Sequence, residues 1–113
     1  MKTYTTINQI QSANEAIDNF FFSKSTMRFF NSRILDKVYK GVYFITTEQF
    51  NNESDRFYTV RMCINGSIQT VGKFQQFETK YKAEKFINSL PEYLPNAYEM
   101  AVEEFNTGTK KGM

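Results

Sequence analysis

The chain has 113 residues, with 14 Lys and Arg against 12 Asp and Glu, and therefore a formal net charge of +2. This length fits one domain, and 41% hydrophobic with 23% charged residues is the composition of a globular protein, which excludes wholesale disorder. There is no His and one Cys, which excludes a Ser-His-Asp triad, a His-ligated metal, an intrachain disulfide and a thiolate zinc cluster. We expect a single domain over residues 1–105 and a flexible tail over residues 106–113.

Two helices are predicted in the first 30 residues. Residues 6–22 carry apolar side chains at helical spacing, and Thr5 or Thr6 can cap the start of this helix. Residues 22–30 form a second, short helix for which Ser23 is the expected cap. We interpret five closely spaced aromatic residues as a core cluster: Phe20, Phe21, Phe22, Phe29 and Phe30.

Three or four antiparallel strands are predicted: residues 33–39 are the candidate for a short first strand, and residues 42–47, 56–64 and 67–74 form the other three. The first pair turns at Lys40-Gly41 and the second at Asn65-Gly66. The Asn-Gly pair is a strong signal for a type I′ turn, because that turn needs a positive φ at both central residues. Along the third strand the side chains alternate, so that Arg61 and Cys63 share a face from which Val60 points away.

Two more helices are predicted after the strands. Thr79 caps a helix that continues to Leu90, with Tyr81 among its inward-facing residues, and a last helix runs from Pro95 to about Phe105. The fold is therefore predicted to be α+β: an antiparallel three- to four-stranded sheet packed by an N-terminal helical pair and a C-terminal helical pair. We expect helices to cover one face of this sheet and water to reach the other at least partly.

The charges are unevenly distributed along the chain. Residues 24–85 carry an excess of Lys and Arg, and a basic sheet face could contact nucleic-acid phosphates through Arg56, Arg61, Lys73, Lys80 and Lys82. The last predicted helix is acidic, and Glu99, Glu103 and Glu104 could bind a partner by imitating the charge of nucleic acid. Both charged surfaces could instead be ordinary solvated faces.

No active site is predicted from the residue types present. Cys63, Ser23, Ser25 and Thr46-Thr47 are candidate nucleophiles, but none has a base nearby in the sequence, and Cys63 lies mid-strand where a thiol packs. The chain contains no phosphate-binding loop, dinucleotide glycine pattern or metal-binding acidic loop. We therefore predict a non-enzymatic protein with no catalytic residues, no cofactor and no metal.

The stretch from Phe22 to about Phe86 resembles a family of small uncharacterised proteins carried by phages, plasmids and other mobile elements. The residues that carry the resemblance are Phe22-Ser23, Thr26–Phe30, Ser32–Ile34, Val38-Tyr39, Gly41, Tyr43–Gln49, Tyr58–Arg61, Thr70–Gly72 and Phe74–Phe77. The resemblance implies that the Thr26–Phe30 and Tyr43–Gln49 blocks form the family's core or site. It implies no particular activity.

Residues 57–90 are also similar to the arm-type DNA-binding module of phage integrases, on the strand, Asn-Gly turn, strand and following helix. That resemblance implies DNA binding through a three-stranded sheet backed by a helix. The order of helices and strands further resembles that of some anti-CRISPR proteins and of double-stranded-RNA-binding domains.

These observations lead to two functional hypotheses. The first is a non-enzymatic phage or mobile-element accessory protein that inhibits a host nucleic-acid-directed defence system of the anti-CRISPR or anti-restriction type. Its partner would be a host nucleic-acid-processing protein or ribonucleoprotein in the bacterial cytoplasm, bound by a monomer or homodimer without membrane contact. The alternative is a regulator that binds DNA or RNA directly through the basic sheet face.

Overall fold

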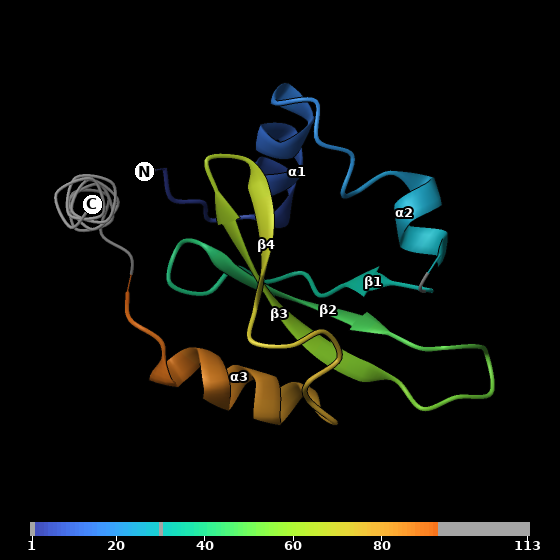
Figure 1. Cartoon of the computed structure of the whole chain (residues 1–113). Coiled ribbons are helices and arrows are strands. Elements are labelled where there is room, and N and C mark those ends of the chain that lie inside the picture. The colour runs from blue at the N-terminus through green and yellow to red at the C-terminus, as the bar shows by residue number, and fades with distance from the viewer. Residues whose placement is uncertain (1, 30, 93–113) are drawn as a thin grey trace, which may run out of the picture.

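The computed structural model describes residues 2–29 and 31–92, which form a four-stranded antiparallel sheet with helices on both sides (Figure 1). The elements are α1 (Ile7–Ala16), α2 (Lys24–Phe29), β1 (Arg33–Ile34), β2 (Tyr43–Glu48), β3 (Phe57–Ile64), β4 (Ser67–Val71) and α3 (Lys80–Ser89). The strands lie in the order β1-β2-β3-β4, and each is antiparallel to the next. The predicted α+β class is confirmed. The predicted helix over residues 95–105 and the tail over residues 106–113 lie outside the described residues.

Threonine caps start both long helices, as the sequence predicts. The Thr6 hydroxyl accepts a hydrogen bond from the Gln9 N–H at 3.2 Å, while Gln9 Oε1 accepts one from the Thr6 N–H, which is a capping box. In α3, Thr79 Oγ1 accepts from the Lys82 N–H at 3.1 Å. The prediction that the first helix reaches residue 22 is wrong, because the chain leaves the helix at Asp18, whose φ is +55°.

Two predicted strands are shorter in the structure. The expected strand over residues 33–39 is reduced to β1 and an isolated bridge between Tyr39 and Tyr43. The segment between them turns locally, with the Lys37 N–H donating to the Leu35 carbonyl. The strand expected over residues 67–74 stops at Val71, because Gly72 has a φ of +84° and redirects the chain.

The sheet face toward α3, which we call the α3 face, carries an apolar core. Tyr43, Ile45 and Val60 from β2 and β3 pack against Ala83 and Ile87 from α3, and all five are buried. The register explains this grouping, because Ile45 lies opposite Val60 and alternate residues of a strand share one face. The α3 face therefore holds the larger apolar cluster of the described residues.

The opposite face, the α1 face, is covered by α1 only near the β3–β4 turn. Ile10 of α1 packs there with Phe44 and Cys63 of the sheet, and all three are fully buried. Phe21 and Phe22 also pack against Phe44, with ring centroids 6.3 and 6.0 Å away. In Figure 1, α1 and α2 lie on one side of the sheet and α3 on the other.

The predicted Asn-Gly turn joins β3 to β4 and lies under α1. Asn65 and Gly66 have φ values of +49° and +92°, so both central residues take the predicted positive φ. Asn14 Nδ2 donates to the Gly66 carbonyl oxygen at 2.8 Å. A Cβ at Gly66 would lie 2.4 Å from the Ala13 carbonyl oxygen, so glycine is also needed for the close approach of turn and helix.

The predicted aromatic core cluster is only partly correct. Phe21 and Phe22 are partly buried against Phe44, whereas Phe20 is 67% exposed and Phe29 is 78% exposed. The reason is that α2 has no buried residue and that Phe20 lies in the turn before it. Residue 30 lies outside the described part of the chain. Phe20 and Phe29 are therefore exposed on this side of the sheet.

Candidate nucleic-acid interface

Arg61, a predicted phosphate ligand, is directed toward the protein's own side chains on the α1 face. Its Nε donates to Thr46 Oγ1 at 3.0 Å and its Nη1 to Thr70 Oγ1 at 2.7 Å. Its Nη2 lies 3.5 Å from Glu48 Oε2, and the Arg61 side chain is 11% exposed. The rings of Phe21 and Phe74 flank the guanidinium carbon, with centroids at 5.2 and 5.5 Å.

The partner of Arg61 is a buried carboxylate. Glu48 is fully buried, and its Oε1 accepts a hydrogen bond from Thr59 Oγ1 at 2.7 Å. The Gln75 N–H in turn donates to Thr59 Oγ1 at 2.8 Å. Burial lowers the pKa of Arg61, and the negative charge of Glu48 opposes that effect. We interpret this pair as structural, because a buried charge is tolerated where a partner and hydrogen bonds compensate it.

Arg56, a second predicted phosphate ligand, also binds within the chain. Its Nη1 donates to the Thr47 carbonyl and its Nη2 to the Asn31 carbonyl, each at 3.0 Å. Burial lowers the pKa of Arg56, as does the neighbouring positive charge of Arg33. Arg56 thus connects β2 to Asn31, which lies in the segment between α2 and β1.

The three predicted lysines remain exposed. Lys80 and Lys82 lie on α3, and Lys73 lies in the segment after β4. Lys82 Nζ is 3.3 Å from Glu78 Oε2, an exposed pair of a kind that contributes little to stability. The structure therefore places two of the five predicted basic residues on one helix and turns Arg56 and Arg61 toward internal partners.

The outer surface of α3 is basic and aromatic. Its exposed residues include three lysines and one tyrosine: Lys80, Tyr81, Lys82 and Lys85. The prediction that Tyr81 faces inward is wrong, since its side chain is 67% exposed. Ala83 and Ile87 define the buried side of α3, and Tyr81 precedes Ala83 by two residues, about 200° around the helix.

A crevice lies between α3 and the segment that precedes β2, and we call it the α3 crevice. Its volume is about 420 Å³, and it is lined by Lys37, Tyr39, Tyr81, Glu84, Lys85 and Asn88. Lys37 Nζ lies 4.7 Å from the centroid of the Tyr39 ring, and Lys85 Nζ lies 5.6 Å from that of Tyr81. The crevice thus combines two ammonium groups, two aromatic rings and one carboxylate.

Hydrogen bonds fix the walls of the α3 crevice to each other. Tyr39 Oη donates to Glu84 Oε2 at 2.7 Å, which links the two walls directly. Lys40 Nζ donates to the carbonyls of Asn88 and Leu90 at the end of α3, at 3.2 and 2.5 Å. Burial, and then the hydrogen bond to Glu84, raise the pKa of Tyr39 above its ordinary value, so this hydroxyl stays a donor at neutral pH.

Sequence reasoning missed four residues of this surface: Lys37, Tyr39, Tyr81 and Lys85. The alternation Lys80-Tyr81-Lys82 is a local signal of basic residues interleaved with an aromatic one, and it could have identified Tyr81. Lys37 and Tyr39 carry no such signal, because only the fold brings them to α3. Glu99, Glu103 and Glu104 of the predicted acidic surface lie outside the described residues.

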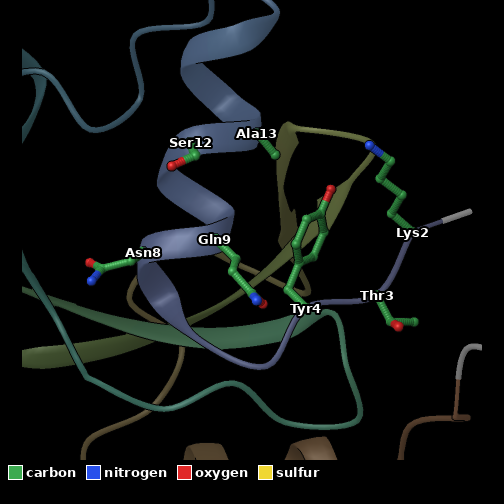
Figure 2. Close-up of a pocket in the computed structure, with 7 residues that line it drawn as sticks. All are labelled: Lys2, Thr3, Tyr4, Asn8, Gln9, Ser12 and Ala13. Carbon is green, nitrogen blue, oxygen red and sulfur yellow. The ribbon is translucent and has the colours of Figure 1, made fainter.

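A larger hollow beside α1 offers less chemistry. It measures about 520 Å³ and is lined by Lys2, Thr3, Tyr4, Asn8, Gln9, Ser12 and Ala13 (Figure 2). In Figure 2 the side chains of Asn8 and Ser12 point away from Tyr4, whose ring lies between α1 and the β3–β4 turn. Lys2 is the only charged residue of its lining, so this hollow carries no group of opposed or paired charges.

The described residues thus form a small α+β protein with a four-stranded antiparallel sheet and a basic, aromatic surface on its last described helix. The chain belongs to DUF7447, a family of unknown function, which it matches over residues 6–88. No curated protein and no solved structure matches it. Among the described residues, no helix is long and apolar enough to cross a membrane, and no three His, Cys, Asp or Glu are grouped to hold a metal.

Proposed function

We propose that the protein acts by binding nucleic acid directly, through the outer surface of α3. The observation that carries the proposal is Tyr81, a large aromatic side chain held exposed between lysines, with the Lys85 ammonium over its ring. Proteins that bind nucleic acid without sequence preference combine cationic side chains, which contact the phosphates, with aromatic rings, which stack on the bases. This is the DNA- or RNA-binding alternative of the sequence analysis, with the site moved from the sheet face to α3.

The charge balance around α3 supports phosphate contact. Lys37 and Lys85 line the α3 crevice, and Lys80 and Lys82 lie on the outer surface of α3. These four lysines outnumber the three acidic residues beside them, which are Asp36, Glu78 and Glu84. Lys82 pairs with Glu78 only at the surface, so phosphate can compete for this lysine. The resemblance of residues 57–90 to the arm-type integrase module, which is drawn from the sequence alone, implies DNA binding, although that module uses its sheet.

The test is a titration of the full chain with labelled single-stranded DNA, duplex DNA and structured RNA over a series of salt concentrations. Four phosphate contacts predict that the logarithm of the association constant falls with that of salt at a slope of about −3 to −4. Lys80→Ala/Lys85→Ala should reduce this slope by about 2 units or slightly less.

The matched control removes the same charge from the other side of the sheet. Lys24 and Arg28 are exposed on α2, so Lys24→Ala/Arg28→Ala should leave binding nearly unchanged. Equal losses in the two double variants would mean unspecific attraction to net charge and would contradict an interface on α3. Absence of binding at low salt would remove direct nucleic-acid binding altogether.

A second candidate function, in a different class, is a phage or mobile-element accessory protein that inhibits a host nucleic-acid-directed defence system. It is favoured by exposed aromatics near α2: Phe29 is 78% exposed and Phe50 is 90% exposed. Asn31, which follows α2, donates from Nδ2 to the side chains of Gln49 and Asn52 on either side of Phe50. Exposed aromatic side chains are frequent anchors of protein interfaces.

This second candidate is tested by nuclease assays. The chain should slow DNA cleavage by a CRISPR or restriction nuclease of its host, and Phe29→Ser/Phe50→Ser should weaken that effect. Lys80→Ala/Lys85→Ala should leave inhibition intact if the nuclease itself is the partner. Glu99→Gln/Glu103→Gln/Glu104→Gln tests the contribution of the predicted acidic helix. An unchanged rate of DNA cleavage at a saturating concentration of the chain would contradict the inhibitor function.

A further inference from the structure

We propose that the α3 crevice holds one unpaired base of a single-stranded nucleic acid, so that the protein binds single strands more tightly than duplexes. The proposal rests on the nucleic-acid binding proposed above and adds the strandedness of the ligand and the location of the base. It is carried by the juxtaposition of Tyr39, Tyr81 and Glu84 with two lysines in one cavity.

The size and walls of the crevice fit a base. Its volume of about 420 Å³ lies within the roughly 300–1,000 Å³ of small-molecule sites. Tyr81 is exposed enough to stack on a base, and stacking accepts any base because every base has a π-face. Tyr39 is partly buried and tied to Glu84, so it forms a fixed wall opposite.

The two lysines suit the flanking phosphates. Lys37 extends from the segment before β2 and Lys85 from α3, so the ammonium groups come from the two sides of the crevice. A strand that places a base between them carries a phosphate on each side of its sugar, which gives each ammonium an anionic neighbour. Paired and stacked bases of a duplex cannot enter, so a duplex would reach the lysines alone.

Glu84 adds a preference among bases. Its Oε2 accepts a hydrogen bond from Tyr39, while its Oε1 accepts none among the described residues. A carboxylate oxygen only accepts, so it favours bases with an exocyclic amino group, which adenine, cytosine and guanine have. Thymine has no amino group, and its one ring donor, N3–H, lies between two carbonyl oxygens that a carboxylate oxygen repels. We therefore expect oligocytidine to bind more tightly than oligothymidine.

The experiment measures fluorescence anisotropy of the full chain with oligocytidine, oligothymidine and a duplex of equal length, at one ionic strength. Deoxyribose and ribose versions of the single strands distinguish DNA from RNA. The wild type should bind the single strands about tenfold more tightly than the duplex. Tyr81→Ala should weaken single-strand binding by roughly 5- to 150-fold and duplex binding by less than about twofold, while Tyr81→Phe keeps the ring and the affinity.

Two further variants separate stacking from base recognition. Glu84→Gln should narrow the difference between oligocytidine and oligothymidine, because its amide carries donors as well as an acceptor. Tyr39→Phe keeps the aromatic ring in the crevice wall and removes the hydrogen bond to Glu84. This variant should therefore keep the preference for single strands. Thermal unfolding of each variant checks that it folds, which the exposure of Tyr81 leads us to expect.

The outcomes distinguish this inference from the function on which it rests. If the wild type binds single strands and duplex equally, and Tyr81→Ala changes neither, the base site is overturned while nucleic-acid binding by the lysines stands. If the wild type binds no nucleic acid, both are overturned. A single-strand preference that is lost in Tyr81→Ala and retained in Tyr81→Phe supports the base site.

Discussion

The two faces of the sheet bury their side chains by different means. On the α3 face, Ile45 and Val60 pack with α3 through apolar contacts alone. On the α1 face, apolar packing around Phe44 gives way to a buried polar cluster formed by Thr46, Glu48, Thr59 and Arg61. All six residues of β2 are buried, so burial by itself says nothing about the chemistry on either side of the strand. The α3 face depends on packed apolar volume, and the polar part of the α1 face depends on the hydrogen bonds and the charge pair that compensate its buried groups.

The largest predicted effect breaks the polar cluster. Arg61→Met should lower the free energy of unfolding by about 4 kcal/mol, because removal of one partner leaves the Glu48 carboxylate buried without its counter-charge. Urea unfolding measures the change. Glu48→Leu/Arg61→Met should recover most of the loss, since replacing both charges by apolar groups removes the uncompensated one. A loss below about 1 kcal/mol for Arg61→Met would show that the pair is not essential.

The corresponding change on the α3 face removes volume. Ile87→Ala should cost about 3 kcal/mol, because Ile87 is fully buried against the sheet and its loss leaves a cavity. The same urea titration measures it, and Ile87→Val should cost no more than about 1.5 kcal/mol. If the two substitutions lower the free energy of unfolding equally, the stability of the α3 face would not depend on packing volume.

The third prediction concerns the contact of α1 with the β3–β4 turn. Gly66→Ala should cost about 2 kcal/mol, because φ is +92° and the new Cβ would lie 2.4 Å from a backbone oxygen. Gly72→Ala is the matched control, since φ is +84° but the nearest atom is the flexible end of Gln76. The midpoint of thermal unfolding should be clearly lower for Gly66→Ala than for Gly72→Ala. Equal midpoints would contradict the close approach of the β3–β4 turn to α1.

The smallest effect is a dependence on pH. The Tyr4 hydroxyl is buried beside Cys63 and makes no hydrogen bond of ordinary geometry among the described residues. Burial, and then the neighbouring Cys63, raise the pKa of Tyr4 to about 12. The unfolded chain loses this proton near pH 10, so the contribution of Tyr4 to stability is complete below pH 10 and is lost between about pH 10 and 12.

The comparison with Tyr4→Phe isolates this group from the lysines. At pH 7 the variant should be at least as stable as the wild type, because the lost hydroxyl has no partner of ordinary geometry and its burial costs free energy. At pH 11 the variant should be the more stable of the two in urea unfolding. A difference that stays constant from pH 7 to 11 would mean that the Tyr4 pKa is the same in the folded and unfolded chain.

Local patterns in the sequence predicted much of the fold. The caps at Thr6 and Thr79 and the turn at Asn65-Gly66 depend on neighbours within a few residues, and all three are confirmed. The ends of the elements were predicted less well, because Asp18 and Gly72 turn the chain where hydrophobic spacing continues. Residue propensity and hydrophobic spacing do not predict where the backbone takes a positive φ and changes direction.

The candidate interface could be predicted only in part. Lys80 and Lys82 stand together in the sequence, whereas Lys37 and Tyr39 reach α3 only through the turn at Lys40. The internal role of Arg61 depends on the register that sets β2 beside β3, which places Glu48 within reach. Both facts come from long-range contacts, which one sequence without its fold does not specify.

The contact between α1 and the β3–β4 turn also bears on how the chain folds. The strands pair with their neighbours in sequence, so the sheet and α3 assemble through short loops. By contrast, the hydrogen bond from Asn14 to Gly66 spans 52 residues, and that from Lys2 to Asn65 spans 63. Closing long loops costs more entropy and slows folding. We therefore expect the four-stranded meander to form in the transition state. We expect α1 to dock last, against the β3–β4 turn.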